Sequence, residues 1–444
     1  MVGTLFKAVR LVNEGSVFES DLRIEGDRIV QIASYIAAQP GDRIVEANGC
    51  YLLPGMIDDQ VHFREPGLVH KGSIATESRA AVAGGITSYM EMPNVSPATT
   101  SIESLEHKFE LAASRSLANY SFYLGATEDN IEQIKQLDPA RHCGLKVFMG
   151  ASTGDLLVED PGALDLIFQH APTLIAAHCE SGPVMLQNER EILRAKDVLT
   201  IEDHPRVRDV EACFAASEYA VGLAKKHGSQ LHVLHITTAK ELDLFSPGPI
   251  DDKNITAEAC VHHLWFTDDD YPRLGNFIKC NPAIKSRQDR DALIEALRTG
   301  RIDIIATDHA PHTLAEKEED YPKAPAGLPL VQHALLSLID HVYHDRISLE
   351  EVVEKTAHNP AKRYAIEQRG YLREGYYADL VLVTPDLTTR VVDSSILYKC
   401  GWSPFVGHTF RSSILGTWVN GERVFDGRRV VETTTHSMAL NFSR

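Results

Sequence analysis

The sequence lacks features that would place it in several large classes of proteins. No apolar run reaches the roughly 18 residues that a membrane-spanning helix needs. The first residues, MVGTLFKAVRLVNEG, carry charges within their apolar run and show no small-residue cleavage site, so we expect no signal peptide. With a net charge of -18, the chain has no basic surplus to neutralise the phosphates of a nucleic acid. We expect a cytoplasmic protein that binds neither membranes nor nucleic acids.

Two motifs built on cysteine and glycine are also missing. The seven cysteines are scattered and never take a C-x-x-C spacing, which predicts reduced and mostly buried thiols. No G-x-G-x-x-G follows a first strand, which argues against a dinucleotide-binding sheet. The remaining composition is that of an ordinary globular protein, with 43% hydrophobic and 24% charged residues in 444. This length allows one large barrel or two to three domains.

The two ends of the chain resemble each other and differ from the middle. Residues 1–53 and 366–444 contain short strand-like runs separated by N-G, D-G and E-G turns, which are typical of hairpins. Residues 54–365 alternate short apolar runs with helix-like segments, which predicts parallel βα units. We therefore expect an α/β fold, with a distorted (β/α)8 TIM-type barrel over 54–365 and a small β-sandwich formed by both termini. A doubly wound sheet is the alternative.

Residues of metal-ligand type stand where the apolar runs of the middle region end. The carboxyl ends of the strands of a parallel barrel surround its active site, so residues at these points should meet. A single histidine there is more often a hydrogen-bonded core residue than a ligand, but the group as a whole predicts a shared metal site. Its members are His62, Lys146, His178, His235 and Asp308.

Two of these residues depend on further arguments. Lys146 lies in the run GLKVFMG, where a buried amine costs several kcal/mol unless it is neutralised or paired; snorkelling to solvent is the alternative. Reaction with carbon dioxide would convert the amine into a carbamate, an anionic oxygen ligand that bridges two divalent ions. His232 and His235 are three residues apart, so on a strand only one faces the barrel interior. His235, at the end of the run, is the better ligand.

The order of these motifs resembles the dihydroorotases of the long, single-chain type, within the amidohydrolase superfamily. The resemblance covers essentially the whole chain, and the ordered set is specific although no single piece is. The pieces are PGMIDDQVHFREPG, AAVAGGITSYMEMPN, LKVFMG, AHCE, LHVLHIT, TAEACVHHLWF, KCNPAIKSRQDRDAL, IATDHAPHTLAEK, NPAKRYAI and GYYADLVLV. The fold that the resemblance implies, a distorted eightfold barrel with a β-sandwich from both termini, agrees with the chain pattern.

The resemblance implies roles for the predicted ligands. His62 would bind a first metal ion, and His178 and His235 a second. Lys146 would bridge the two ions as a carbamate. Asp308 would bind the first ion and transfer protons. The implied cofactors are Zn2+, one or two per chain, and carbon dioxide as the carbamate on Lys146.

The resemblance also implies a substrate-binding set. Arg64 lies two residues after His62, where related hydantoinases and allantoinases typically lack an arginine. Dihydroorotate carries a ring carboxylate, which a guanidinium binds bidentately. For the two asparagines of the set, a purely structural role in turns beside proline is the alternative. The implied set is Arg64, Asn94, Asn281, His312, Ala326 and Gly327.

The activity that follows is the reversible hydrolysis of (S)-dihydroorotate to N-carbamoyl-L-aspartate in pyrimidine (UMP) biosynthesis, by a hydroxide that the metal activates. The alternatives are a related cyclic amidohydrolase, such as a hydantoinase or allantoinase, and a non-catalytic homologue that serves aspartate carbamoyltransferase as a structural partner. Beyond the small-molecule substrate, two partners are left open: a second copy of the chain, and aspartate carbamoyltransferase.

One residue departs from the pattern of the resemblance. Gln60 occupies a position where histidine is usual, and an amide oxygen is a weaker zinc ligand than imidazole. Gln60 and His62 are two residues apart and should face the same way on a strand. Three outcomes are open: a weakly bound first metal, a second metal alone, or a non-catalytic chain. Because the other ligands are all present, we favour an active enzyme.

Overall fold

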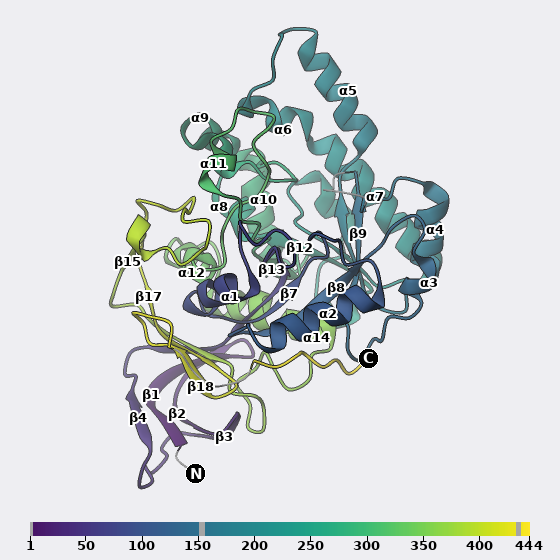
Figure 1. The fold of residues 1–444 in the computed structure, drawn as a ribbon. Helices are drawn as coiled ribbons and strands as arrows, with labels where there is room; N and C mark the ends of the chain where they lie inside the picture. The colour runs from purple at the N-terminus through teal and green to yellow at the C-terminus, as the bar shows by residue number, and fades with distance from the viewer. Residues whose placement is uncertain (1–2, 151–155, 432–436) are drawn as a thin grey trace.

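The computed structural model describes residues 3–150, 156–431 and 437–444. Its centre is a barrel of parallel strands in sequential order, from β6 to β13, with its helices outside (Figure 1). The first and last strands meet where His62 donates its backbone N–H to the carbonyl of His309, at 2.7 Å. The strands are β6 (Met56–Val61), β7 (Ile86–Glu91), β8 (Asn119–Gly125), β9 (Gly144–Met149), β10 (Ile175–Cys179), β11 (Leu231–Val233), β12 (Ile255–Cys260) and β13 (Ile304–Ala306).

The helices between these strands follow the amphipathic segments of the sequence. Several begin at the side chain of a serine or aspartate: Ser73, for example, accepts a hydrogen bond from the backbone N–H of Thr76 at the start of α1. The longest, α7, ends at Gly228 in the left-handed conformation, with φ 71°. The main helices are α1 (Ile74–Ala83), α2 (Ile102–Ala113), α4 (Pro161–His170), α5 (Gly182–Leu193), α7 (Val210–His227), α10 (Arg287–Arg298), α12 (Ala334–Tyr343) and α14 (Asn359–Tyr364).

Strands from both ends of the chain form a separate sheet beside the barrel (Figure 1). β5 joins the two contributions, because it pairs in parallel with β1 and antiparallel with β14. This sheet has its own apolar core, in which the rings of Phe6 and Trp418 lie 4.9 Å apart. Its strands are β1 (Gly3–Asn13), β2 (Ser16–Glu25), β3 (Arg28–Ala33), β4 (Arg43–Glu46), β5 (Tyr51–Pro54), β14 (Leu380–Thr384), β17 (Ser413–Val419) and β18 (Glu422–Phe425).

The last residues of the chain leave this sheet and return to the barrel. Leu440 donates its backbone N–H to the carbonyl of Tyr120 on β8, and the Arg444 guanidinium donates to the carbonyl of Tyr364 on α14. Figure 1 shows this final segment running beneath the barrel strands. The C-terminus therefore packs against the amino-terminal ends of the barrel strands. These ends lie opposite to the strand ends that carry the predicted ligands.

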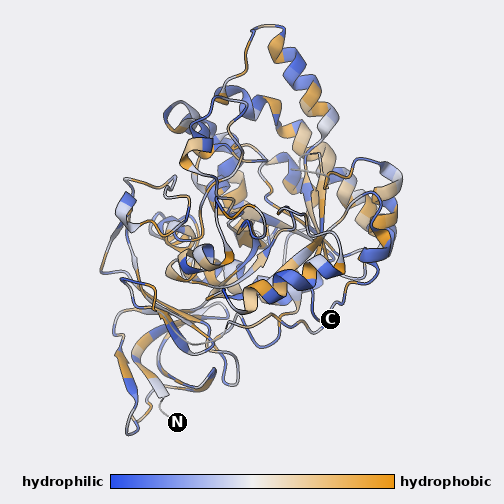
Figure 2. Cartoon of the chain, in the orientation of Figure 1, coloured by the Kyte–Doolittle hydropathy of each residue, from blue (hydrophilic) through white to orange (hydrophobic). Residues whose placement is uncertain are grey.

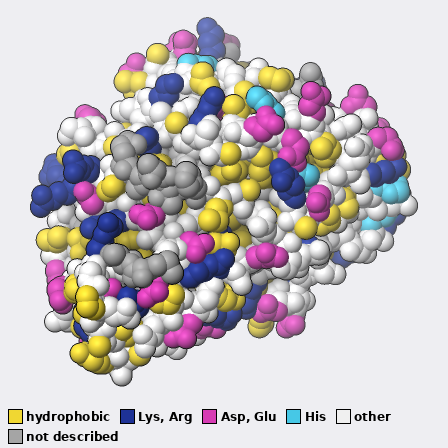
Figure 3. Space-filling view, turned by 60° about the horizontal axis from the view of Figure 1, so that its bottom comes forward, with side chains coloured by type: hydrophobic (Ala, Val, Ile, Leu, Met, Phe, Trp, Pro, Cys, Tyr) yellow, Lys and Arg dark blue, Asp and Glu magenta, His cyan; other side chains and the backbone are white. Residues whose placement is uncertain are grey.

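The distribution of polarity agrees with this architecture. The strands at the centre of the molecule are largely hydrophobic, whereas hydrophilic residues lie on the outer surfaces of the helices (Figure 2). On the face shown in Figure 3, acidic and basic side chains are intermingled and apolar ones form small groups. All seven cysteines are buried free thiols, as predicted. Among the described residues, no helix is long and apolar enough to cross a membrane.

Candidate active site

A cavity of about 430 Å³ opens at the carboxyl ends of the barrel strands. It brings together every residue that the sequence assigned to a site, although their positions in the chain span more than half its length. Those lining it are Gln60, His62, Arg64, Asn94, Lys146, His178, His235, Asn281, Asp308, His312, Ala326 and Gly327, together with Phe148, Gly150, Leu157, Arg208, Ala310 and Pro325.

One side of the cavity is formed by His62, which follows β6, and Asp308, which follows β13. The Nε2 atom of His62 lies 3.0 Å from Asp308 Oδ1, and its Nδ1 lies 2.6 Å from the amide oxygen of Asn94. Amide and carboxylate oxygens both accept hydrogen bonds, so both ring nitrogens of His62 face acceptors. With the proton on Nδ1, held by Asn94, Nε2 presents its lone pair beside the Asp308 carboxylate, which is the tautomer that a metal ligand needs. His62 is thus oriented as a metal ligand, and Asn94 orients it.

The other side of the cavity is formed by His178 on β10 and His235 after β11. His178 Nδ1 and His235 Nε2 lie 3.0 Å apart. His178 Nε2 lies 3.0 Å from Glu180 Oε2, which assigns its proton to Nε2 and leaves Nδ1 facing the cavity. Burial lowers the pKa of both imidazoles, so both are neutral, as metal ligands must be.

Glu180 is in turn held by Arg208, whose guanidinium forms a short ion pair with the same Oε2 atom. Burial would raise the pKa of this carboxyl, but Arg208 and His178 outweigh it and lower the pKa to about 2. The three side chains form a chain of contacts that ends at the ring of His178, whose Nδ1 faces the cavity. The sequence analysis did not single out Glu180 or Arg208 for the site. The one local signal that could have indicated Glu180 was its position, two residues after the predicted ligand His178.

Lys146, on β9, lines the same cavity. Its side chain is buried, and its Nζ atom has no hydrogen-bond partner within the described ranges. The amine interacts electrostatically with Asp308 on one side and with both histidines on the other. Burial lowers the pKa of Lys146 to about 7. A large fraction is therefore the neutral amine, which is the form that reacts with carbon dioxide.

These residues fit a divalent metal centre. Two neutral imidazoles present nitrogen atoms to each other, and a third faces a carboxylate. The buried amine of Lys146 has no hydrogen-bond partner among the described residues and lies over the ring of Phe148. Imidazole and carboxylate are typical ligands of zinc. The chemistry of this donor set as a whole, rather than any one residue, fits a divalent metal ion, as the sequence predicted for these residues.

Three residues that line the cavity have backbone conformations that favour glycine. The φ angles of Arg64, His235 and Asp308 are 71°, 37° and 49°. Such angles are unfavourable for residues with a Cβ and concentrate at functional sites. His235 and Asp308 each come two residues after the end of their strands, so these turns aim the side chains into the cavity.

The spacing of His232 and His235 predicted that only one of them faces the barrel interior, and this prediction was wrong. β11 ends at Val233, so parity does not apply at His235, which is turned by its own backbone. His232 also faces the barrel interior: its Nε2 lies 3.2 Å from Asp59 Oδ2 on β6, a strand that is not a neighbour of β11. His232 is buried one layer below the cavity, and His235 lines it.

Gln60 and His62 both line the cavity, as their spacing predicted. The amide oxygen of Gln60 lies 3.8 Å from the sulfur of Cys260, at the end of β12. Gln60 is buried, so its amide cannot turn to solvent. The position where an imidazole was expected therefore offers an amide oxygen beside a thiol.

Arg64 forms the part of the wall suited to an anion. Its Nε donates to the carbonyl of Pro311 at 3.1 Å, and Nη2 lies 3.1 Å from Nε2 of His312. Within the described ranges, no protein group accepts from Nη1. The side chain is buried, and burial lowers the pKa of Arg64 to about 10, so it stays charged at neutral pH. The guanidinium edge at Nη1 is thus available to a ligand.

The wall beside Arg64 is held by a buried lysine. The Nζ atom of Lys317 in α11 (Leu314–Lys317) donates to the carbonyls of Pro325 and Gly327 at 2.9 and 3.0 Å. Gly327 has φ 141°, and a Cβ there would lie 2.4 Å from the carbonyl oxygen of Ala310. Only glycine fits so close to its neighbour. Across the cavity, the buried amide oxygen of Asn281 has no partner among the described residues.

The geometry agrees with comparisons to known proteins. The chain belongs to the amidohydrolase family, whose model matches residues 51–424. It is 35% identical to the dihydroorotase of Halobacterium salinarum over 413 residues, which cover 92% of this chain and 94% of that protein. It is 32% identical to the allantoinase of Solibacter usitatus over 431 residues, covering 94% and 92%.

Among solved structures, the chain is similar to the L-hydantoinase (dihydropyrimidinase) from Arthrobacter aurescens. The TM-score is 0.92 at 27% identity, with 97% of this chain and 98% of that chain covered. The predicted α/β barrel fold is confirmed. Within its superfamily the chain is a cyclic amidohydrolase, an enzyme of small molecules. The names of these relatives refer to different cyclic substrates, so the residues of the cavity have to distinguish between them.

Proposed function

We propose that this protein is a dihydroorotase, which hydrolyses (S)-dihydroorotate reversibly to N-carbamoyl-L-aspartate, a step in the synthesis of pyrimidines. The observation that carries the proposal is the buried, charged Arg64 at the edge of a cavity with metal-ligand character. Dihydroorotate has a carboxylate on its ring, whereas hydantoin and allantoin have none. A buried cation is unfavourable unless a counter-charge meets it, and the substrate carboxylate supplies one.

The remaining polar groups of the wall suit the rest of the ring. The amide of Asn281 and the carbonyl of Ala326 face the cavity and offer acceptors and donors to ring N–H and C=O groups. His312 Nε2 lies 3.0 Å from the carbonyl oxygen of Ala326, to which it can donate, and 3.1 Å from Arg64 Nη2, so the imidazole lies between the guanidinium and this wall. Positioning of this kind accounts for a large part of enzymatic rate acceleration.

The metal part of the proposal assigns ligands to the two sides of the cavity. His62 and Asp308 would hold one zinc ion, and His178 and His235 another, with Lys146 as a carbamate between them. A zinc ion bound there would activate water and polarise the carbonyl that is attacked. Asn94 and Glu180 fix the ring nitrogens that His62 and His178 present.

Asp308 has the position of the proton-transfer group. Its carboxylate lies at the cavity edge beside His62, on a backbone turn that fixes its direction. In hydrolysis it would accept the proton of the attacking water and donate it to the ring nitrogen that leaves. The C–N bond of the ring breaks as the new C–O bond forms, and the same group serves in reverse.

The test is the ultraviolet-monitored ring opening of (S)-dihydroorotate by the protein loaded with zinc in bicarbonate, against dihydrouracil, hydantoin and allantoin. Preference for dihydroorotate is expected. A preference for a ring without a carboxylate would overturn the substrate assignment. If a folded, zinc-loaded protein opened none of these rings, Gln60 would instead mark a chain that has lost its catalytic activity. The chain would then be a non-catalytic partner of aspartate carbamoyltransferase, and mixing the two proteins in a sedimentation experiment would detect the complex.

A further inference from the structure

The feature that the proposed function leaves unexplained is the corner at Gln60. An amide oxygen is a poor replacement for imidazole as a zinc ligand, yet the other predicted ligands are all in place. The structure brings a sulfur to this corner from a distant part of the chain: Cys260 lies 3.8 Å from the Gln60 amide oxygen, and the two residues are 200 positions apart in sequence. They meet because β12 lies next to β13, which closes the barrel onto β6.

Cys260 is directed toward the barrel interior. Its sulfur lies 3.3 Å from Oε1 of Glu258, two residues earlier on the same strand, and Glu258 also accepts the backbone N–H of His235. Burial and the neighbouring carboxylates of Glu258 and Asp308 raise the pKa of the thiol, so the thiolate would form only where a metal ion displaces the proton. The thiol is fully buried and Cys260 is not among the residues that line the cavity, but it contacts Gln60, which does line it.

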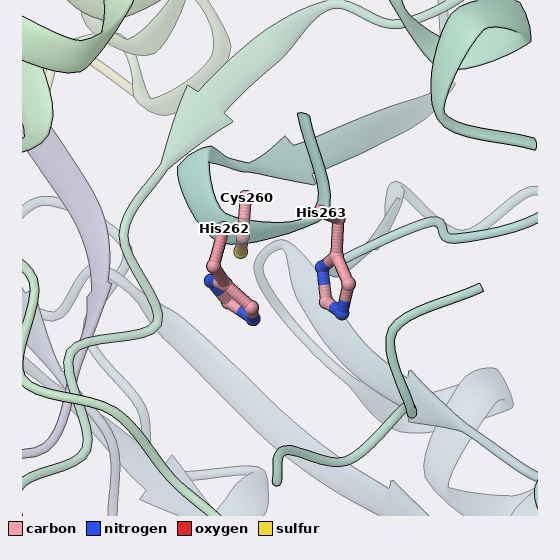
Figure 4. A group of neighbouring side chains, drawn as sticks. All are labelled: Cys260, His262 and His263. Atoms are coloured by element: carbon pink, nitrogen blue, oxygen red, sulfur yellow. The ribbon is translucent and has the colours of Figure 1, made fainter. Parts of the chain in front are cut away.

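A second donor stands beside the thiol. His262 is the second residue of the short helix α8 (Val261–Trp265), and one of its ring nitrogens lies within 4.8 Å of the Cys260 sulfur. Figure 4 shows the Cys260 and His262 side chains pointing in the same direction from the chain. The ring is fully buried, and neither nitrogen has a hydrogen bond of ordinary geometry to a described residue. The backbone of Thr307 gives it only a weak interaction, and Asp308 acts on it electrostatically.

A buried imidazole with two unsatisfied nitrogens is unusual, because each buried polar atom without a partner costs about 1–3 kcal/mol. A metal ion is one partner that would satisfy it. The neighbouring His263 differs: its Nε2 lies 3.0 Å from the carbonyl oxygen of Pro282, which engages that nitrogen. Of the cluster, His262 has both ring nitrogens without a partner among the described residues, whereas the Cys260 thiol contacts Glu258 and Gln60.

We propose that Cys260, supported by His262, supplies the soft ligand at the metal centre that histidine at position 60 would otherwise supply. Cys260 would bind as the thiolate and release its S–H proton to solvent, with no change in oxidation state. Thiolate is among the strongest protein ligands for zinc, so it compensates for the weak amide. Gln60, whose amide oxygen is a weaker ligand than the thiolate, is then the polar neighbour of the sulfur.

This inference rests on the metal centre of the proposed function, and spectroscopy tests it without relying on turnover. The full-length protein is loaded with cobalt(II) in place of zinc, and its near-ultraviolet absorption is recorded. Bound thiolate gives an intense sulfur-to-cobalt charge-transfer band. We expect this band in the native protein and its loss in Cys260→Ser. His262→Gln should keep the band but weaken cobalt binding about tenfold or more, as loss of one ligand or its support does.

Cys280→Ser is the matched control. Cys280 is equally buried, lies near Asp308 and contacts the carbonyl of Pro282, but does not contact Gln60. The band should persist in this variant. X-ray absorption at the zinc edge of the native protein needs no variant, and should show a sulfur neighbour at about 2.3 Å in addition to lighter atoms at about 2.0–2.1 Å.

The outcomes separate this inference from the proposed function. Cobalt binding without a sulfur band, or a band that survives in Cys260→Ser, would overturn the thiolate ligand even if dihydroorotate is hydrolysed. A cysteine-dependent band in a protein that does not open dihydroorotate would support the ligand and refute the substrate. A native protein that binds no cobalt or zinc would overturn both.

Discussion

Replacing Arg64 tests the assignment of the substrate most directly. The guanidinium is anchored through Nε to the Pro311 carbonyl and through Nη2 toward His312, so only its Nη1 edge and the remaining Nη2 hydrogen are free for a ligand. Arg64→Ala removes those donors and the positive charge. Hydrogen bonds to charged groups contribute about 1.5–3 kcal/mol each and do not add fully, so we expect a loss of about 3 kcal/mol, or roughly 150-fold in kcat/KM.

The loss should appear mainly as a raised KM, because a carboxylate remote from the reacting carbonyl is bound alike in the ground state and the transition state. Steady-state kinetics with dihydroorotate and with dihydrouracil, the same ring without the carboxylate, measures this. The variant should approach the native enzyme on dihydrouracil. Arg64→Lys keeps the charge but not the planar fork, and should give an intermediate loss on dihydroorotate.

The comparison of the two rings can also contradict the role of Arg64 in binding the carboxylate. An equal loss on both rings would mean that Arg64 acts by holding the wall through Pro311 and His312 rather than by binding the carboxylate. Circular dichroism and thermal unfolding of the variant show whether the wall stays folded. The positive φ of Arg64 applies equally to alanine and lysine, so the two variants share any backbone cost.

Three further predictions concern the metal centre. Lys146→Ala should abolish turnover and lower the zinc content measured by atomic absorption; normal turnover would refute the carbamate. Glu180→Gln should weaken metal binding about 10–100-fold by loosening His178, measured by competition with a chelating dye, and unchanged affinity would contradict the tautomer assignment. The carboxyl of Glu180 has its pKa lowered from 4.5 to about 2, so its ionised form stabilises the fold above pH 4.5. In acid unfolding of the metal-free proteins, the stability difference between native and Glu180→Gln should shrink as the pH falls from 4.5 toward 2. A constant difference would contradict it.

Chelation gives a prediction for the whole fold. Removing zinc should lower the Tm, and adding it back should restore it, since a ligand at 100 times its Kd stabilises the folded state by about 2.7 kcal/mol. Differential scanning calorimetry with and without chelator measures the shift, with magnesium as the control ion. An unchanged Tm would show that the cavity holds no structural metal.

Much of this protein was determined by its sequence alone. Strand–helix alternation predicted the barrel, because hydrophobic periodicity is a local property that survives without knowledge of the fold. The ligand-type residues at strand ends predicted one cavity, because parallel strands must end on the same side. The family resemblance, rather than the strand ends, added residues such as His312, and the structure places it in the lining of the same cavity as His62.

Other features were decided only by the tertiary structure. The direction of His235 depends on a backbone turn after β11, which a strand-parity rule cannot describe. The contacts of Glu180 with Arg208, and of Gln60 with Cys260, join residues 28 and 200 positions apart. Such pairs depend on where the barrel closes and how loops fold over it. Local sequence patterns carry no record of these contacts, because each residue alone is equally compatible with an ordinary buried position.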